Sequence, residues 1–238
     1  MVISFVNLKG GTGKTTLSYI FATSINDYLK AKMKILVVDS DPQANLSMKL
    51  LSDDPKNTLA QVYKGLIKPK KAVYPTIFED VDIIPSSVEL GLIDTPRMNL
   101  SRTLKALNYD LVIIDCPPAI GTLTANAVLA SDAVIIPISP EEMALKGYEL
   151  TNGLTEASGR KVIKKVVINL VDRRYSAHKA FVEVIGEALR EDLLAILSKR
   201  SAYYNAVETH SRPLKTVHGD ARRELLQLLG AVVRAVGL

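Results

Sequence analysis

The nine residues LKGGTGKTT, at positions 8–16, decide how the rest of the chain is interpreted. They lie between a short apolar run, VISFVN at 2–7, and a stretch with a helical pattern at 14–31. A phosphate-binding loop has the pattern G-x-x-x-x-G-K-[ST] between a strand and a helix. The stretch ends as this pattern does, but Leu8 stands in the place of the first glycine and Lys9 follows it. The sequence therefore predicts a phosphate-binding loop with an additional lysine.

The residue types in this stretch suit the binding of phosphate. Gly10, Gly11 and Gly13 allow the backbone to turn tightly, so that its N–H groups converge on phosphate oxygens. The amino end of the following helix adds the positive end of its dipole. Lys14 can reach the β- and γ-phosphates, and the hydroxyl of Thr15 can bind Mg²⁺. A glycine-rich turn also occurs without a ligand, but the strand before it and the helix after it favour a nucleotide site.

Short apolar runs alternate with helical patterns along the chain, and most of these runs are continuous. Continuous runs are typical of strands that are buried on both faces of a parallel sheet. We therefore expect an α/β fold of three layers, with a mostly parallel central sheet flanked by helices. Together with the phosphate-binding loop at 8–16, this predicts a P-loop NTPase domain. No repeat or long linker divides the chain, so a single domain over 1–238 is expected. The expected strands are 2–7, 34–40, 81–86, 110–117, 133–139, 165–171 and 193–198; the expected helices are 14–31, 97–108, 121–131, 141–158, 177–191 and 219–236; and 52–57 and 68–75 are expected to be loops.

Composition excludes several classes of protein. The chain has 238 residues, of which 47% are hydrophobic, so it can build a substantial core. Its single cysteine excludes a disulfide framework and a C-x-x-C metal site. No signal peptide and no apolar run of about 18 residues, the length of a membrane span, is present. We expect a cytoplasmic protein.

Charge is distributed unevenly along the chain. Residues 1–159 hold 15 Lys and Arg against 17 Asp and Glu, whereas 160–238 hold 15 against 8. A basic C-terminal third suggests a polyanionic partner, either nucleic acid or an anionic membrane. An ordinary solvated surface rich in basic residues explains the same count, so charge alone leaves the question open.

The segment KGGTGKTT resembles the deviant Walker A motif of the ParA/MinD family of P-loop ATPases, whose pattern is K-G-G-x-G-K-[ST]. In that family the first lysine, here Lys9, crosses a nucleotide-sandwich dimer to the phosphates bound by the other subunit. The resemblance implies ATP and Mg²⁺ as cofactors, a homodimer that forms with ATP, and a role for Lys9 like that of an arginine finger. It also implies that Lys9 and Lys14 act in catalysis. The implied ATP-binding residues of the loop are Lys9, Gly10, Gly11, Thr12, Gly13, Lys14, Thr15 and Thr16.

The segment VVDSDPQAN, at 37–45, resembles the first switch region of the same family. By that match Asp41 orients the attacking water, and Asp39 supports the network of Mg²⁺ and water; both are expected to act in catalysis. Two carboxylates one residue apart at the end of a strand could instead cap the following helix.

The segment YDLVIIDCPP, at 109–118, is an apolar strand that ends in Asp115, as a Walker B carboxylate does. The resemblance therefore implies Mg²⁺ binding by Thr15, Asp39 and Asp115. Cys116 is expected to be a small buried apolar residue. The segment SDAVIIPISPEEMALKG, at 131–147, resembles the next strand and loop of the family.

Three alternatives within this group of folds are weighed against a ParA-type protein. MinD-type proteins bind membrane through a C-terminal amphipathic helix. The chain end, at 221–238, has an apolar stripe that could serve as such an anchor or could pack on the sheet. Packing is favoured because the polar face of this helix is short and holds few lysines. Iron–sulfur carriers related to nitrogenase iron protein need several cysteines. Metabolic ligases on this fold generally lack the D-x-D-P-Q segment.

A ParA-type partition ATPase is the remaining interpretation. The resemblance implies binding of nonspecific duplex DNA by the ATP dimer, a nucleoid-associated location, and stimulation of slow hydrolysis by a ParB-like centromere-binding partner. Because the first strand begins at Val2, we expect no N-terminal helix-turn-helix domain and no autonomous repressor activity. No membrane partner is expected. The cargo could be a plasmid, a chromosome or a protein assembly.

The same resemblance implies that contacts with adenine and with DNA come from residues after the later strands. Asn169 and residues 198–201 are the candidates for contacting adenine. Tyr203 and Tyr204 are interpreted as packing residues or as lining near the nucleotide. The candidates for DNA contact are Lys199, Arg200, Arg212, Arg222 and Arg223, with Arg173 and Arg174 behind them, although each could be a solvated surface charge.

Overall fold

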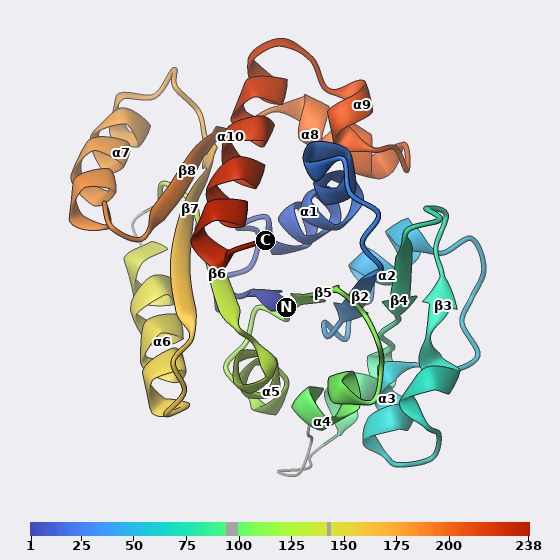
Figure 1. Cartoon of the computed structure of the whole chain (residues 1–238). Coiled ribbons are helices and arrows are strands. Elements are labelled where there is room, and N and C mark those ends of the chain that lie inside the picture. The colour runs from blue at the N-terminus through green and yellow to red at the C-terminus, as the bar shows by residue number, and fades with distance from the viewer. Residues whose placement is uncertain (94–99, 142–143) are drawn as a thin grey trace.

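The computed structural model of the chain describes residues 1–93, 100–141 and 144–238. Within these ranges eight strands form one sheet in the order β3-β4-β2-β5-β1-β6-β7-β8 (Figure 1). Every neighbouring pair is parallel except β3 and β4, which are antiparallel. The mostly parallel sheet predicted from the sequence is therefore confirmed. Its strands are β1 Val2–Phe5, β2 Ile35–Asp39, β3 Tyr74–Pro75, β4 Val81–Ile84, β5 Leu111–Asp115, β6 Ala133–Ile138, β7 Ile163–Val171 and β8 Leu193–Ser198.

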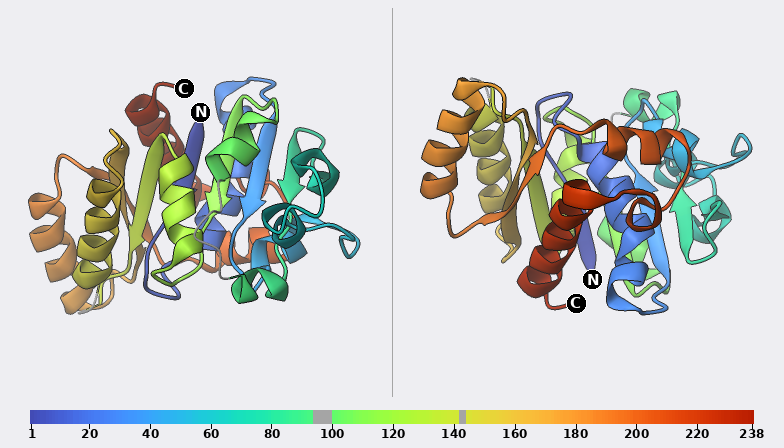
Figure 2. Two further views of the ribbon diagram at one scale, coloured as in Figure 1. Left: turned by 90° about the horizontal axis from the view of Figure 1, so that it is seen from below. Right: turned by 90° about the horizontal axis from the view of Figure 1, so that it is seen from above.

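Helices cover both faces of the sheet and produce three layers (Figures 1 and 2). Helices α1, α2, α8, α9 and α10 pack on one face, and α3 to α7 pack on the other. The helices are α1 Lys14–Leu29, α2 Asn45–Leu50, α3 Leu59–Tyr63, α4 Leu100–Lys105, α5 Thr122–Ala130, α6 Ala144–Ala157, α7 Ser176–Ala188, α8 Ser201–Glu208, α9 Pro213–Thr216 and α10 Gly219–Val236, with two 3₁₀ helices, η1 Pro69–Ala72 and η2 Val88–Leu92.

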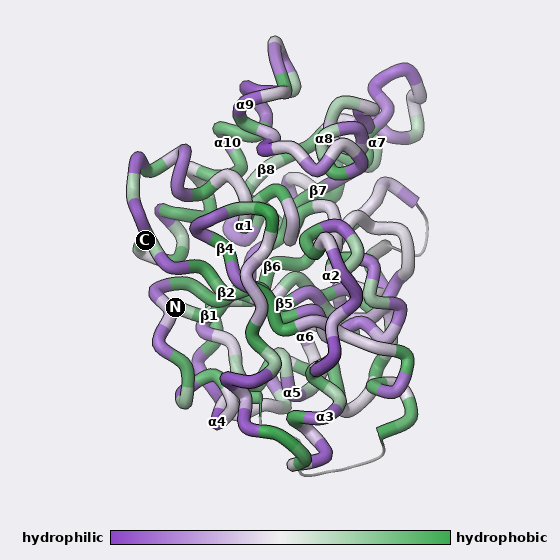
Figure 3. Tube along the Cα trace, turned by 90° about the vertical axis from the view of Figure 1, so that its right-hand side faces the viewer, coloured by the Kyte–Doolittle hydropathy of each residue, from purple (hydrophilic) through white to green (hydrophobic). Residues whose placement is uncertain are grey.

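Strand β2 illustrates why the strands contain continuous apolar runs. All five of its residues are buried. Ile35 and Val37 face the core beneath α1, while Leu36 and Val38 face the core on the opposite side of the sheet. Successive side chains of a strand point to opposite faces, so a strand covered on both faces is apolar along most of its length. The only polar residue of β2, Asp39, is its last residue. Figure 3 shows the same pattern, with mostly hydrophobic strands inside and hydrophilic loops around them.

Several short elements were not predicted from the sequence. Helices α2, α3 and α9 have six, five and four residues, which is too short for a 3.6-residue period to be recognised. The stretch 68–75, predicted as a loop, contains η1 and β3. The helix predicted over 97–108 is shorter, because α4 ends at Lys105; residues 97–99 lie outside the described residues.

Helix α10 packs its apolar stripe into the core, as the sequence predicts. Leu225, Leu228, Leu229 and Val232 are at most 1% exposed, and the helix lies against β8 and α1. Among the residues that the structure describes, no helix is long and apolar enough to cross a membrane.

The carboxyl ends of β2, β5 and β1 lie side by side. Asp39 at the end of β2 is in register with Asp115 at the end of β5, and Asp115 is in register with Phe5 at the end of β1. The loop 8–16 follows β1 directly and leads into α1. We refer to this region, the three carboxyl ends together with the loop 8–16, as the loop edge. In open α/β sheets ligands bind at such an edge.

Candidate functional site

The loop 8–16 has the backbone conformation that its glycines permit. Gly11 and Gly13 have φ of 75° and 90°, a region that residues with a Cβ rarely adopt. A Cβ on Gly13 would also collide with the side-chain amide of Asn169. Helix α1 begins immediately afterwards, with Leu17 N–H donating to the Gly13 carbonyl over 2.9 Å. Backbone N–H groups therefore remain available at the start of α1, where an anion is favoured.

Lys14 lies at the start of α1 and is only 6% exposed. Its ammonium donates to the Lys9 carbonyl over 3.0 Å, which holds the loop in a closed curve. Burial lowers the pKa of Lys14, and the nearby carboxylates of Asp115 and Asp41 oppose this shift. An ammonium has three donors, so Lys14 keeps donors for a ligand.

Asp115 is fully buried and receives hydrogen bonds from two hydroxyl groups of α1. Thr15 Oγ1 donates to one carboxylate oxygen over 2.7 Å, and Ser18 Oγ donates to the other over 3.1 Å. Ser18 lies three residues after Thr15, so both hydroxyls are on the same face of the helix. The end of β5 and the start of α1 are thereby fastened together.

Asp39 is also fully buried, and its hydrogen bonds come from the segment that follows β2. Ser47 donates to one carboxylate oxygen of Asp39 with both its N–H, over 2.8 Å, and its hydroxyl, over 2.7 Å. The N–H of Asp41 donates to the other oxygen over 3.1 Å. The orientation of Asp39 is thus set by α2, because Ser47 belongs to that helix.

The two buried carboxyl groups carry an electrostatic cost. Burial is the main cause that raises the pKa of both Asp39 and Asp115. The charge of Asp39 raises the pKa of Asp115 further, and hydrogen bonds to each carboxylate oppose the rise without cancelling it. Two adjacent carboxyl groups with raised pKa values form a site where a cation would be stabilised.

Asp41 lies just beyond β2 and is 8% exposed. One of its carboxylate oxygens accepts the N–H of Gln43 over 3.0 Å, and its carbonyl accepts the N–H of Ala44 over 2.9 Å. Asp41 therefore stabilises the turn that leads into α2 but does not cap that helix, whose N-cap residue is Ala44 and has no side-chain cap hydrogen bond. Its second carboxylate oxygen accepts no hydrogen bond from the described residues, so this oxygen remains available as an acceptor.

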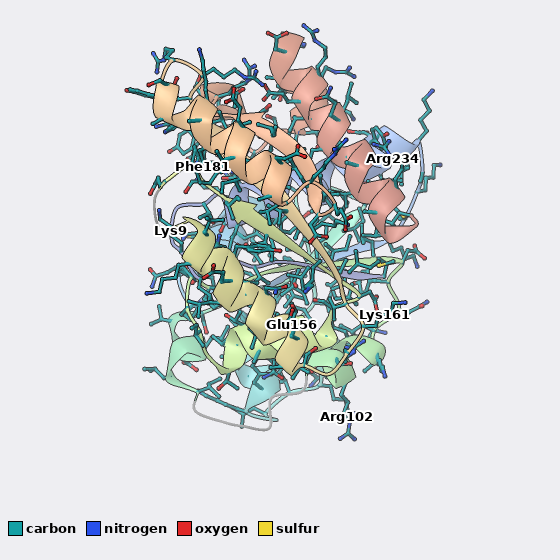
Figure 4. The ribbon with its side chains drawn as sticks, turned by 90° about the vertical axis from the view of Figure 1, so that its left-hand side faces the viewer. Lys9, Arg102, Glu156, Lys161, Phe181 and Arg234 are labelled. Atoms are coloured by element: carbon teal, nitrogen blue, oxygen red, sulfur yellow. The ribbon has the colours of Figure 1, made fainter. Side chains whose placement is uncertain are left out.

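Lys9 turns away from its own loop toward the end of β6. Its ammonium forms an ion pair with Glu141, and the two side chains are 27% and 61% exposed. Figure 4 shows Lys9 beside the amino-terminal end of α6. The Lys9 N–H donates to Asn7 Oδ1 over 2.8 Å, and Asn7 Nδ2 donates to the Pro137 carbonyl over 2.6 Å. The backbone at Lys9 is thus anchored to β6, while its side chain is held by an exposed partner that can release it.

Asn169, a candidate for adenine contact, lies against the phosphate loop. Its side-chain amide donates to the Thr12 carbonyl over 2.9 Å, and the residue is 4% exposed. In this position Asn169 supports the turn at Gly13, a role that the sequence does not indicate. In the other candidate segment, 198–201, Ser198 is buried and bonded to Glu224 through both its N–H and its hydroxyl.

Two of the predicted DNA contacts, Arg212 and Arg200, form ion pairs within the fold. Arg212 is 16% exposed in its side chain; it pairs with Asp80, donates to the Thr23 carbonyl over 3.0 Å and stacks 5.0 Å from the ring centroid of Phe78. Arg200 pairs with Glu224 over 2.8 Å. Donors that are used inside the fold are less available to phosphate, so we regard Arg200 and Arg212 as weaker candidates for DNA contact than the exposed basic residues.

The other basic candidates are more exposed. Arg173, Arg174, Lys199, Arg222 and Arg223 are all exposed. Arg174 pairs with Asp172 over 2.6 Å and Arg223 pairs with Asp220, but both pairs lie at the surface, where an ion pair contributes little. Lys199 has no side-chain partner among the described residues. Of the two tyrosines, Tyr203 is buried and donates to Glu224 over 2.8 Å, whereas Tyr204 is 61% exposed.

Sequence reasoning missed four residues that hold the site in place: Asn7, Ser18, Ser47 and Glu141. Ser18 could have been found from its spacing of one helical turn after Thr15. Asn7, Ser47 and Glu141 could not have been found in this way, because no regular spacing in the sequence links them to the residues that they contact. Glu224, which holds the start of α8, had a signal: it is an acidic residue on the buried stripe of α10.

Mg²⁺ and a nucleotide fit the residues of the loop edge. Mg²⁺ prefers oxygen ligands and is commonly held by one or two carboxylates together with substrate phosphates. Asp39, Asp115 and Thr15 supply such oxygens, and a cation would offset the cost of the two buried carboxylates. The hydroxyl of Thr12 is buried with no hydrogen-bond partner among the described residues, as is expected of a group that awaits a ligand.

Comparison with known proteins places the chain among P-loop ATPases. A family model described as an AAA domain matches residues 1–166. The chain is 31% identical over 231 residues to the sporulation initiation inhibitor protein Soj of Bacillus subtilis (strain 168), and the match covers 90% of this chain and 89% of Soj. It is 32% identical over 196 residues to the virulence plasmid ParA family protein pGP5-D of Chlamydia psittaci, covering 77% and 74% of the two chains.

Solved structures share the fold over almost the whole length. A Borrelia burgdorferi B31 protein assigned to plasmid partition, solved with AMPPNP, has a TM-score of 0.86 at 22% identity and covers 98% of both chains. The septum site-determining protein MinD of Pyrococcus horikoshii OT3, solved with Mg-ADP, has a TM-score of 0.82 at 27% identity and covers 99% of this chain and 97% of its own. The P-loop ATPase fold predicted from the sequence is confirmed.

Proposed function

The chain belongs to the ParA family of P-loop ATPases, and from this premise we propose that it is a DNA partition ATPase whose ATP-bound dimer moves a plasmid, a chromosome or another cargo. One observation carries the proposal: the loop that carries Lys9 and Lys14 is joined through Thr15 to a buried pair of carboxylates on adjacent strands, while Lys9 itself pairs outside that loop with Glu141. This combination supports both hydrolysis and an action of Lys9 outside its own loop.

The residues of the loop edge have separate roles in the proposed hydrolysis. Lys14 and the backbone N–H groups of residues 10–16 bind the phosphates of ATP. Thr15, Asp39 and Asp115 would hold Mg²⁺, which when bound would stabilise the charge that develops on the transferred phosphoryl group. Asp41 orients the attacking water with the carboxylate oxygen that the turn leaves free. Ser18 and Ser47 keep Asp115 and Asp39 in position.

Dimer formation depends on the release of Lys9. In the proposed dimer each Lys9 crosses to the phosphates bound by the other subunit and stabilises the developing charge there. The ion pair with Glu141 must break first, and because both side chains are partly exposed the cost is low, about 1 kcal/mol or less. Glu141 therefore keeps the lysine ordered in the monomer without preventing its transfer.

The DNA surface of the proposed dimer is the exposed basic group Lys199, Arg173, Arg174, Arg222 and Arg223, without Arg200 and Arg212. If about six to eight phosphates are contacted by the two subunits together, the log-log slope of affinity against salt is about −5 to −7. A ParB-like partner then stimulates hydrolysis and releases the dimer. The whole chain acts as one ATPase domain.

The test is binding to random-sequence duplex DNA and, in parallel, to anionic liposomes, each with ATP, with ADP and without nucleotide. Salt-sensitive DNA binding that requires ATP, without liposome binding, is the expected result. ATP-dependent liposome binding without DNA binding would replace the proposal with a MinD-like positioning ATPase. The residues to change would then be the stripe of α10 that is buried here.

A further inference from the structure

A cavity of about 1010 Å³ lies at the amino ends of β2, β4 and β5, whereas the loop edge lies at the carboxyl ends of the strands. Ile35, Val73, Leu107 and the partly buried Tyr109 form its apolar part. Pockets for small ligands typically have volumes of about 300–1,000 Å³, an apolar lining and a few polar groups. The cavity therefore has the size of a ligand site, and none of its residues belongs to the loop edge.

Two of the four carboxylates that line the cavity are used inside the fold. Asp80 pairs with Arg212 and accepts a hydrogen bond from Asn26 Nδ2 over 2.8 Å. Asp82 accepts the hydroxyl of Tyr109 over 2.6 Å. These contacts reduce the negative charge that the cavity presents to a ligand.

Asp27, near the end of α1, is the third carboxylate and is only weakly compensated. Its oxygens lie 3.8 Å from Arg212 and 3.7 Å from Lys215. Asp27 Oδ2 is buried and accepts no hydrogen bond from the described residues. Buried acceptors are normally paired, so this oxygen suits a ligand that donates a hydrogen bond.

Three lysines at the cavity have no side-chain partner. Lys32 and Lys34 come from the turn between α1 and β2, and Lys70 comes from η1. All three are exposed, and their ammonium groups form no ion pair or hydrogen bond with the described residues. The fourth carboxylate, Glu79, is exposed and likewise unpaired among the described residues. Three unpaired ammonium groups against one unpaired carboxylate favour an anionic ligand.

We propose that this cavity binds a nucleotide with two or more phosphates, at a site that hydrolysis at the loop edge does not use. Lys32, Lys34 and Lys70 contact the phosphates through charge-assisted hydrogen bonds. The base lies against the apolar part of the cavity, where Tyr109 supplies an aromatic ring, and an amino group of the base donates to Asp27 Oδ2. A concave site with an apolar lining suits a small molecule better than it suits duplex DNA, whose phosphates are met by open basic surfaces.

The first experiment counts the ADP molecules bound per chain, by equilibrium dialysis at ADP concentrations up to about 1 mM. Wild-type protein should bind two, one at the loop edge and one in this cavity. The variant K32Q/K34Q/K70Q should bind the second ADP at least tenfold more weakly, because three charged contacts are removed.

The matched control changes three exposed lysines of the same two segments, 30–34 and 68–71, that do not line the cavity. This variant, K30Q/K68Q/K71Q, has the same net charge as K32Q/K34Q/K70Q and should bind the second ADP as wild type does. Both triple variants should melt within about 2 °C of wild type, because the altered side chains are exposed.

Two results overturn the proposal: a single ADP per wild-type chain, and equal affinity of the two triple variants for the second ADP. If K32Q/K34Q/K70Q keeps the second ADP but binds duplex DNA more weakly than the control, its lysines belong to a DNA surface instead. Failure of the proposed function would be seen separately, as absence of ATP hydrolysis by wild type, and would leave the count of ADP molecules unaffected.

A second experiment distinguishes a nucleotide from a free phosphate chain. Pyrophosphate carries nearly the same charge as ADP but has no base, so competition between the two at the second site measures the contribution of the base. Asp27→Ala should lower the preference for ADP over pyrophosphate at least fivefold, because it removes the acceptor for the base and changes the local charge alike for both ligands. The control Glu79→Ala removes an exposed carboxylate and should leave the preference unchanged. An equal preference in D27A and wild type would show that the cavity holds phosphate alone and would contradict the nucleotide.

Discussion

Charged residues at the loop edge and in the basic C-terminal third have opposite surroundings. Asp39 and Asp115 receive hydrogen bonds from hydroxyl and backbone groups but have no salt bridge with the described residues. Arg200 and Arg212, by contrast, are paired with carboxylates of the same chain. Charges that the fold leaves uncompensated are available to a ligand, whereas charges that it compensates stabilise the fold itself. A count of charges cannot distinguish the two.

The largest expected effect that tests this contrast is at Lys9. Lys9→Ala should lower ATP turnover by a factor on the order of 10³, since a cation supplied in trans contributes that much, and should abolish dimerisation with ATP. Its melting temperature should stay within about 2 °C of wild type, because the pair with Glu141 is exposed. Phosphate release, sedimentation velocity and calorimetry measure the three quantities. Normal turnover in K9A would show that the lysine acts in no other subunit.

Arg212→Ala should show the reverse pattern. Removing this guanidinium leaves Asp80 partly buried without its partner and removes the contact with Phe78, so the free energy of unfolding should fall by about 2–4 kcal/mol. The melting temperature should then fall by roughly 5–12 °C for a chain of this length. DNA affinity measured well below that temperature should be unchanged. The matched control is Arg190→Ala, whose side chain is 79% exposed and which should change stability by less than about 0.5 kcal/mol.

A smaller effect is expected from pH, through Glu224. Burial opposes its ionisation, but hydrogen bonds from Arg200, Ser198 and Tyr203 outweigh burial and lower the pKa of Glu224 from 4.5 to about 2. A carboxyl group with a lowered pKa in the folded state contributes stability that is complete above its unfolded pKa and is lost as pH falls from about 5 to 2. The contribution is on the order of 2–3 kcal/mol.

Urea unfolding of wild type and Glu224→Gln at several pH values measures this contribution. The difference in stability between the two should be largest near neutral pH and should shrink as the pH is lowered through the window from about 5 to 2. A difference that is independent of pH would mean that Glu224 acts through packing and not through its charge.

The smallest expected effect is at Lys199, the exposed basic candidate that has no side-chain partner among the described residues. Lys199→Ala should weaken ATP-dependent DNA binding about equally for all sequences and reduce the salt slope by about one unit for each phosphate that is no longer neutralised. Titrations at several salt concentrations measure the slope. An unchanged slope would place the DNA surface elsewhere.

Features that depend on a local pattern could be predicted from the sequence, whereas contacts between residues that are distant in the chain could not. All strands except the two-residue β3, the loop 8–16 and the helix after it were predictable because hydrophobic patterns and a fixed motif are local properties. Asp39 and Asp115 could be placed together because each ends a parallel strand. The pairing of Arg212 with Asp80 joins residues far apart in the chain, and no local pattern reports it. Helix α2, with the serine that orients Asp39, was missed because six residues are too few to show a helical period.

The two ends of the chain lie close together on the side of the sheet opposite the loop edge (Figures 1 and 2). Met1 and Leu238 both pack against the core beneath α1, and the Met1 ammonium donates to the Asp110 carbonyl at the amino end of β5. A fluorescent protein fused to the carboxyl terminus would therefore sit far from the nucleotide. Neighbouring ends also suit joining by a short linker, so that the chain could be reopened at an exposed turn as a circular permutant. Such permutants would allow labels to be attached at new positions on the surface of the protein.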